Sequence, residues 1–356
     1  MKFIHTGDFH IGATLSKASF ARKEDLIKRR REIEGAFERL LDAIQERDVE
    51  YLFITGDLFD HAQVALSKID HFFNRLASCK AEVFIVIGNH DTFLHNQAYA
   101  HIRDLKNIHF LDAQTDCVKH DDVHVYGLST RDFDESKLMT MNAHLDETKI
   151  NVLCLHGDVF NKQDDHYLTD VKTLASLHFD YIALGHIHKH EFLHPHIAYS
   201  GNLEPLDFSE TAPRGYIEGT LGKPIKARFV EFAKRRFMVK SLTLTKDDTY
   251  YTLEKKLQAL FTEEERTTHF TRVILTGTMS RDIKLTDSDI DNLKEPFYAL
   301  DINDETKHDL NLTQLKKDYK DTIIDHLITA YQDDLHDEES LLLALDALLS
   351  SEGGSR

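Results

Sequence analysis

Five short polar motifs in the first half of the sequence contain residue types that bind metal ions. They are Gly7–His10, Gly56–Asp60, Gly88–Asp91, His156–Asp158 and Gly185–His188. Carboxylate, amide and imidazole groups suit Mn, Fe, Zn, Ni or Mg, and the motifs contain no cysteine, which weakens a structural zinc interpretation. Two cations ~3.5–4 Å apart serve phosphatases and nucleases, where a metal-held hydroxide attacks phosphorus. The motifs therefore predict a binuclear centre that hydrolyses phosphoesters.

Each motif taken alone has a simpler explanation. An Asp-x-His sequence such as Asp8–His10 is most often a surface turn, Gly56–Asp60 is compatible with a helix N-cap, and His156 with a satisfied core histidine. The five motifs together, each directly after an apolar run, favour a shared metal site over five unrelated turns.

The apolar runs before the motifs predict the elements that position them. They are short, β-branched or aromatic, and bounded by turn residues, so we predict buried strands near residues 3–4, 51–54, 83–87, 123–126, 152–155 and 181–184. Apolar residues spaced three and four apart predict helices over about 33–44 and 64–76. Alternating strands and helices indicate an α/β domain, whose ligand sites lie at the carboxyl ends of the strands.

With these motifs in order, the chain resembles the calcineurin-like metallophosphoesterase superfamily. The opening Phe3–His10 and the segments 184–188, 199–202 and 206–210 resemble, more narrowly, SbcD-type DNA repair exonucleases. The resemblance is strong over residues 1–215 and concerns only the layout beyond them. It implies a four-layer α/β sandwich nuclease domain (1–212), a small α+β DNA-capping domain (213–295) and an acidic, helical partner-binding segment (296–356).

The resemblance also implies two divalent metal ions, most often Mn²⁺, and a role for each motif residue. One ion would be bound by Asp8, His10 and His188. The other would be bound by Asn89, His156 and His186, with Asp57 bridging both. His90 would contact the scissile phosphate, with Asp91 orienting its imidazole as a catalytic partner. Asp60 is left out of the predicted site, because some relatives carry histidine there.

The charge of the chain is distributed unevenly. The sequence has 61 acidic and 43 basic residues, a formal net charge of −18, which at face value discourages binding to nucleic acid. Half of that charge lies in residues 301–350, whereas residues 223–240 hold seven basic residues and one acidic residue. An isolated basic run is usually a solvated face, but in a phosphodiesterase it favours DNA. The predicted DNA-binding residues are Lys223, Lys226, Arg228, Lys234, Arg235 and Arg236.

Two apolar stripes near the C-terminus predict amphipathic helices. One contains Ile323, Ile324, Leu327, Ile328 and Tyr331, and the other contains Leu341, Leu342, Leu345, Leu348 and Leu349. Such stripes either pack within their own domain or dock on a partner helix. The resemblance favours the second alternative and implies an SbcC-like coiled-coil ATPase as partner, together with a homodimer.

These observations predict a Mn-dependent DNA nuclease that acts in double-strand-break repair, an exonuclease with endonuclease activity left open. The alternatives are a phosphoprotein phosphatase or cyclic-nucleotide phosphodiesterase of the same superfamily, and a non-catalytic scaffold with this fold. Three cysteines without a disulfide framework, no signal-peptide pattern and no membrane-span pattern lead us to expect a cytoplasmic protein.

Overall fold

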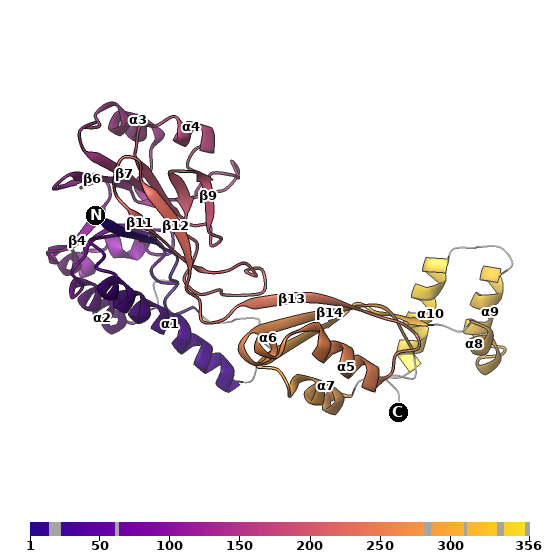
Figure 1. Cartoon of the computed structure of the whole chain (residues 1–356). Helices are drawn as coiled ribbons and strands as arrows, with labels where there is room; N and C mark the ends of the chain where they lie inside the picture. Colours follow the sequence, from indigo (N-terminus) through magenta and orange to yellow (C-terminus); the bar gives the residue numbers. More distant parts are fainter. Residues whose placement is uncertain (14–22, 61–63, 281–285, 310–311, 333–337, 353–356) are drawn as a thin grey trace. The chain divides into compact units, whose positions relative to one another are not determined.

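The computed structural model describes residues 1–13, 23–60, 64–280, 286–309, 312–332 and 338–352. The chain forms two compact units, Met1–Met238 and Val239–Arg356, and the boundary falls inside strand β13 (Phe237–Leu244). Across the described part of the chain, no helix combines the length and apolarity needed to cross a bilayer. The first unit contains the predicted α/β domain (Figure 1).

Two six-stranded sheets form the centre of the first unit. The first sheet has the order β12 (Lys226–Glu231), β11 (Gly215–Thr220), β1 (Lys2–Thr6), β2 (Tyr51–Thr55), β3 (Glu82–Val86) and β4 (Ile108–Leu111). The second has the order β5 (Cys117–His120), β6 (Val123–Leu128), β7 (Ile150–His156), β8 (Tyr181–Gly185), β10 (Ile197–Tyr199) and β9 (Glu191–His194). Strands β1 to β4 are mutually parallel, as are β6, β7, β8 and β10.

Side chains alternate between the two faces of each sheet, as the period of a strand requires. In β2, Leu52 and Ile54 enter the core beneath the helices, whereas Tyr51 and Phe53 enter the core between the sheets. The central strands are buried on both faces, which explains their continuous apolar runs.

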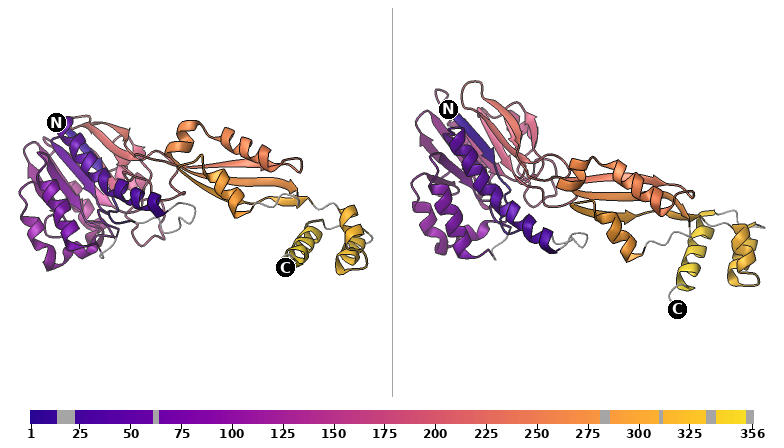
Figure 2. Two further views of the ribbon diagram at one scale, coloured as in Figure 1. Left: turned by 90° about the horizontal axis from the view of Figure 1, so that it is seen from below. Right: turned by 60° about the horizontal axis from the view of Figure 1, so that its bottom comes forward.

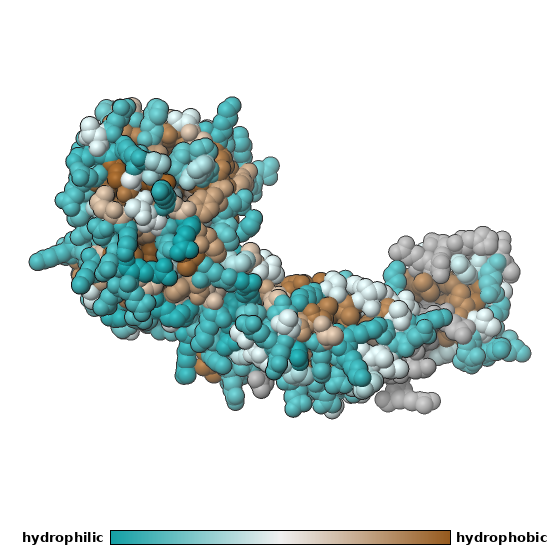
Figure 3. All heavy atoms as spheres, in the orientation of Figure 1, coloured by the Kyte–Doolittle hydropathy of each residue, from teal (hydrophilic) through white to brown (hydrophobic). Residues whose placement is uncertain are grey.

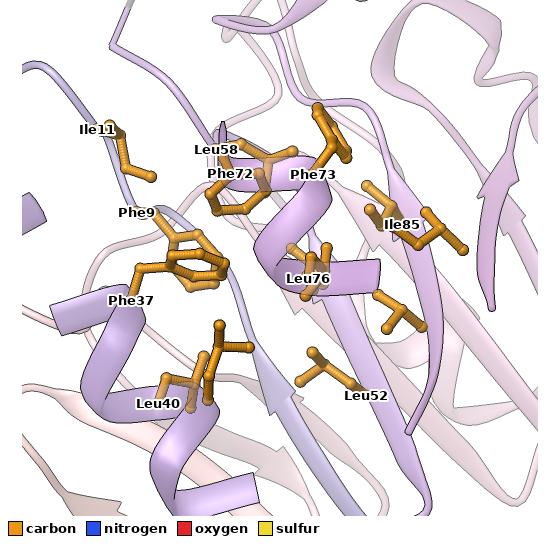
Figure 4. Packing of buried hydrophobic residues seen from close by; sticks show 14 of the residues in the cluster. Phe9, Ile11, Phe37, Leu40, Leu52, Leu58, Phe72, Phe73, Leu76 and Ile85 are labelled. Atoms are coloured by element: carbon orange, nitrogen blue, oxygen red, sulfur yellow. The ribbon is translucent and has the colours of Figure 1, made fainter. Parts of the chain in front are cut away.

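Helices cover the outer face of each sheet. Helices α1 (Lys23–Glu46) and α2 (Leu66–Ala77) pack on the first sheet, where the rings of Phe37 and Phe72 lie 4.2 Å apart (Figures 2 and 4). Helices α3 (Glu135–Ala143) and α4 (Val171–Ala175) pack on the second sheet through residues that include Leu138 and Leu174. The order helix, sheet, sheet, helix confirms the predicted four-layer sandwich.

The predicted domain boundary at residue 212 differs from the structure. Strands β11 and β12 pair antiparallel with each other, and β11 pairs with β1, so residues 215–231 complete the first sheet. The sequence prediction places these residues in the capping domain (213–295) instead. In the sheet, a Cβ at Gly219 would lie 2.5 Å from the Phe3 ring, so glycine permits close packing there.

The second unit is a mixed α+β structure. Strands β13, β14 (Phe270–Ser280), β15 (Ala299–Asp304) and β16 (Lys307–Asp309) form its sheet. Helices α5 (Tyr250–Leu260), α6 (Glu263–Thr268) and α7 (Asp287–Lys294) each begin after a threonine whose hydroxyl accepts a hydrogen bond from the first turn.

Three helices follow this sheet: α8 (Leu312–Asp318), α9 (Ile323–Ala330) and α10 (Glu338–Glu352). The two predicted apolar stripes meet in one small core, where Ile324 and Ile328 of α9 pack with Leu341 and Leu345 of α10. The inner face of each stripe is therefore buried in this small core. Ile323 and Leu343 remain largely exposed, and apolar residues are visible on this part of the surface (Figure 3).

Candidate metal centre

Asp57 lies at the middle of the converging motifs. It follows β2, is buried, and has a left-handed backbone with φ of 52° directly after Gly56 with φ of 87°. Its Oδ2 atom lies 3.4 Å from His156 Nε2 and 3.8 Å from His10 Nε2. One carboxylate therefore faces histidines from both sheets, which is the position that a bridging ligand requires.

One cluster beside Asp57 contains Asp8, His10 and His188. Their ligand atoms all lie within 4.8 Å of one another, and the two histidine Nε2 atoms are 3.0 Å apart. His188 Nδ1 donates a hydrogen bond of 2.5 Å to Glu210 Oε1, so the Nε2 lone pair is directed into the cluster. This contact fixes the tautomer that a metal ligand needs.

The second cluster contains Asp57, His156 and His186, again within 4.8 Å. Asn89 Oδ1 lies 2.9 Å from His156 Nε2 and 3.3 Å from His186 Nδ1. His156 Nδ1 donates a hydrogen bond of 2.7 Å to the carbonyl of Thr55, which directs its Nε2 towards Asn89 and Asp57. The structure thus brings all seven predicted ligand residues together, in the two groups that the sequence suggested.

The donor set and its spacing fit two divalent cations. Ligand atoms bound at about 2.1 Å in octahedral geometry lie ~3 Å apart, close to the separations above. Burial would lower the pKa of His156, but the carboxylates of Asp57 and Asp8 outweigh it and raise the pKa to about 9. For Asp57 the effects are reversed: burial would raise its pKa, but the nearby His156 and His10 hold that pKa below its usual range. The same negative field favours a metal cation at this position.

Four of the seven candidate ligands have left-handed backbones. Asp8, His10, Asp57 and His186 have φ values of 52°, 45°, 52° and 95°. Such conformations are unfavourable for residues with a Cβ and persist where the surrounding structure enforces them, often at functional sites. The strand-to-loop turns therefore aim these side chains at one point.

The glycines of the motifs serve mainly to allow close approach of the chain. A Cβ at Gly88 would lie 2.1 Å from Asp57 Oδ1, and a Cβ at Gly185 would lie 1.9 Å from the carbonyl oxygen of Thr55. Among the glycines that directly precede predicted ligands, only Gly56 has a positive φ. At Gly88 and Gly185 the reason is space between adjacent loops.

His90 lies at the exposed edge of the site. Its ring packs edge-on to that of His10, with centroids 4.9 Å apart, and its Nδ1 donates a 2.5 Å hydrogen bond to the carbonyl of Asp60. The predicted role of Asp91 is wrong in its detail, because Asp91 does not orient His90. Its buried carboxylate accepts hydrogen bonds from the backbone N–H groups of Leu58 and Phe59, at 2.8 and 3.0 Å. Asp91 therefore holds the loop that follows Asp57.

Asp60 and Glu210 belong to the site, although sequence reasoning did not assign them to it. Asp60 forms a third group with His10 and His90, and its Oδ1 lies 3.7 Å from His10 Nδ1. Glu210 orients His188, which lies 22 positions earlier in the sequence. Burial would raise the pKa of Glu210, but its hydrogen bond to His188 outweighs burial and lowers the pKa to about 2. The only sequence signal for Glu210 was its place in the family-like segment 206–210.

The predicted DNA-binding residues do not form one surface near the metal centre. Arg235 is buried, and its guanidinium forms hydrogen bonds of 2.8–3.0 Å with Glu32 of α1, so its assignment as a DNA contact is contradicted by its position. Lys226 lies opposite Thr220, which pairs with Lys2 at the amino end of β1. Because the metal ligands follow the carboxyl end of β1, Lys226 lies at the far end of the sheet.

The other cations of this segment have acidic or carbonyl partners. Lys223 Nζ contacts the carbonyl oxygen of Glu147, Arg228 pairs with Glu218, Lys234 lies 3.7 Å from Glu32, and Arg236 pairs with Glu231. Of the phenylalanines among them, Phe237 is buried and Phe229 and Phe232 are half-buried. The Phe229 ring stacks on that of His190, with ring centroids 3.5 Å apart. Lys234 and Arg236 lie beyond the carboxyl end of β12 and are exposed or partly exposed.

These features define a family. Residues 1–190 match the calcineurin-like phosphoesterase family, and the chain belongs to it. Metallophosphoesterases use a binuclear divalent metal centre, and the chain has candidate ligands for that centre.

The chain is also similar to individual proteins. It is 25% identical over 232 residues to the metallophosphoesterase YhaO of Bacillus subtilis, covering 61% of this chain and 56% of that protein. It is 26% and 28% identical to proteins named DNA double-strand break repair protein Mre11 from Methanopyrus kandleri and Thermoplasma acidophilum. Those matches cover 65% and 60% of this chain, and 57% and 59% of the two relatives. The chain thus spans less than two thirds of these curated relatives.

The chain also has matches among solved structures, at low sequence identity and low TM-score. TT1561 of Thermus thermophilus is 12% identical with a TM-score of 0.41, covering 56% of this chain and 89% of that one. A dimetal phosphatase from Danio rerio is 11% identical with a TM-score of 0.40, covering 64% and 98%.

Proposed function

We propose that the chain is a divalent-metal-dependent DNA nuclease that hydrolyses phosphodiester bonds. The observation that carries the proposal is the convergence of six other candidate ligand side chains around Asp57, with His90 exposed beside them. The Mre11 relatives support DNA as the substrate, because they are named as DNA repair proteins. The family-like segment that contains Glu210 points the same way.

The residues of the chain have separable roles in this proposal. The two ions, which we propose to be Mn²⁺, would supply a hydroxide nucleophile and stabilise the charge that develops on phosphorus. Asp57 and Asn89 hold the donor atoms that place the ions. His90 Nδ1 donates to the Asp60 carbonyl, so Nε2 faces the substrate. In the imidazolium form, which carries a proton on both nitrogens, Nε2 would donate a hydrogen bond to the phosphate or the leaving oxygen.

We further propose that DNA contacts extend to Lys234 and Arg236, which are exposed or partly exposed. Phosphate contacts come from local basic clusters and are compatible with a net charge of −18. For Arg236, binding would exchange the exposed ion pair with Glu231 for a phosphate. Exposed ion pairs contribute little stability, so breaking this pair costs little free energy.

The C-terminal helices are proposed to bind an SbcC-like coiled-coil ATPase. Ile323 and Leu343 are 62% and 75% exposed, while the inner faces of their helices pack together. Exposed apolar side chains in acidic surroundings suit a partner with apolar and basic residues. A homodimer and a cytoplasmic location complete the proposal. Loss of ATPase co-purification upon deletion of residues 338–352 tests the partner.

The central experiment is a nuclease assay on end-labelled duplex DNA with Mn²⁺ or Mg²⁺. We expect the wild type to shorten the DNA, and Asp57→Ala and His90→Ala to reduce the rate by at least ~100-fold. His71→Ala is the matched control, because His71 is an exposed histidine on α2 outside the site. Equal degradation by all variants would refute the site. Activity on phosphopeptides or cyclic nucleotides without activity on DNA would favour the alternative substrates.

A further inference from the structure

A loop beside the candidate metal centre carries an exposed aromatic ring. The loop, residues 158–167, follows β7 and flanks His186: Asp164 Oδ1 lies 4.0 Å from His186 Nε2, and the His166 ring lies 5.6 Å from the His186 ring. The loop therefore forms one wall of the site. Phe160 in this loop has 53% of its surface exposed.

The position of Phe160 is fixed by the backbone of its loop. Asp158 Oδ1 accepts hydrogen bonds from the N–H groups of Phe160 and Asn161, at 2.5 and 3.0 Å. The base of the loop is closed by bonds from Asp158 N to the His166 carbonyl and from Leu168 N to the Asp158 carbonyl, at 2.9 and 2.8 Å. A side chain on a backbone held in this way is presented at a defined place, although it is exposed.

The ring of Phe160 is supported from beneath by Tyr199. The two ring centroids lie 6.0 Å apart at an interplanar angle of 30°, and Tyr199 is fully buried. The Tyr199 hydroxyl donates a 2.7 Å hydrogen bond to the carbonyl of Gly157, the residue after His156. Tyr199 thus contacts both the Phe160 ring and the backbone next to His156, a candidate metal ligand at the end of β7.

We propose that Phe160 is a substrate-positioning residue that stacks on an unpaired base of DNA next to the metal centre. The inference rests on the proposed nuclease function and specifies its substrate: a strand whose bases are unpaired near the scissile phosphate. Inside a duplex both faces of a base are covered by its neighbours, so an aromatic ring can stack on an internal base only when that base has left the duplex stack. Such stacking is independent of base identity. Lys162, two residues further on, is exposed, and its charge is available to an adjoining phosphate.

The proposal separates two substrates of the same metal centre. Bis(p-nitrophenyl) phosphate is a small phosphodiester without a nucleobase, and its hydrolysis reports on the metal centre alone. Single-stranded DNA and duplex with a single-stranded overhang offer unpaired bases, and blunt duplex does not. We expect Phe160→Ala to raise KM for single-stranded DNA about tenfold with kcat within ~twofold, and to leave bis(p-nitrophenyl) phosphate hydrolysis unchanged.

Further variants distinguish stacking from a structural role. Phe160→Trp should restore the KM for single-stranded DNA, whereas Phe160→Leu, which keeps apolar bulk without a planar ring, should behave like Phe160→Ala. Met139→Ala removes another exposed apolar side chain, from α3, and should change neither activity. Quenching of 2-aminopurine fluorescence at one position of a single-stranded probe, lost in Phe160→Ala, reports the stack directly.

The outcomes separate this inference from the function on which it rests. A wild type that hydrolyses bis(p-nitrophenyl) phosphate but cleaves no DNA would refute the proposed function, and this inference with it. A wild type that cleaves DNA while Phe160→Ala has an unchanged KM would refute the inference alone. Equal losses on DNA and on bis(p-nitrophenyl) phosphate would also refute it, because they would show that Phe160 only maintains the site.

Discussion

Replacing Arg235 by alanine should destabilise the first unit without weakening a DNA contact. Arg235 forms three hydrogen bonds of 2.8–3.0 Å with Glu32, whose side chain is 5% exposed. Removing one partner of a buried ion pair costs about 3–5 kcal/mol, because the remaining charge stays buried. Arg29 at 3.5 Å and Lys234 at 3.7 Å still neutralise Glu32 in part, which favours the lower end of that range.

The loss of ~3 kcal/mol corresponds to a fall in melting temperature of about 6–12 °C for a unit of this size. Calorimetry and far-UV circular dichroism are suitable, since the sequence has no tryptophan for fluorescence. Arg236→Ala is the matched control: its pair with Glu231 is exposed, so the expected change is below ~1 kcal/mol. The double variant Glu32→Leu/Arg235→Met should recover much of the lost stability.

Measurements of DNA affinity distinguish a structural role of Arg235 from a role in contacting DNA. If Arg235 is structural, its alanine variant binds DNA with unchanged affinity and salt dependence at temperatures where it is folded. If Arg235 contacts phosphate, the variant keeps its stability, binds DNA more weakly and has a salt slope smaller by ~1. A change in unfolding free energy below ~0.5 kcal/mol would refute the structural interpretation.

Three further predictions concern the same unit. Burial would raise the pKa of Glu32, but Arg235, Arg29 and Lys234 outweigh it and lower the pKa below 4.5. The ionised Glu32 therefore stabilises the fold above pH 4.5, and this stabilisation is lost as the pH falls through the lowered pKa. In an acid titration, the free energy of unfolding should fall more steeply for the wild type than for Glu32→Gln. Gly88→Ala should weaken metal binding ~100-fold by calorimetric titration, because its Cβ would collide with Asp57 Oδ1; a wild-type affinity would contradict this. Chelation with EDTA should abolish phosphodiester hydrolysis and lower the melting temperature, and Mn²⁺ at 100 times its Kd should restore ~2.7 kcal/mol; a melting temperature unaffected by EDTA and Mn²⁺ would argue against the site.

The sequence predicted those features that are written into short segments. The runs at 51–54 and 83–87 are apolar on both strand faces, and the motifs that follow them are local, so both the sandwich and the ligand candidates could be recognised. Residues 215–231 were misassigned, because their pairing with β1 is a contact across more than two hundred positions. No local pattern records such a partner.

The same reason explains the errors within the site. The partner of Asp91 could not be read from its neighbour His90, because its hydrogen bonds go to a different loop. Arg235 was indistinguishable from Arg236 in a basic run, although one is buried against Glu32 and the other pairs with a nearby residue. Charge patterns indicate where cations occur, and only the fold determines which of them face solvent.

The two sheets contribute different halves of the candidate metal centre. Asp8, His10, Asp57 and Asn89 follow strands of the first sheet. In the second sheet, His156 is the last residue of β7, and His186 and His188 follow β8. Neither half holds a complete coordination shell, so high-affinity metal uptake must come late in folding, after the sheets have docked. Metal affinity therefore reports whether the two sheets have docked. A fragment that ends before β7 should fold partly and bind metal only weakly.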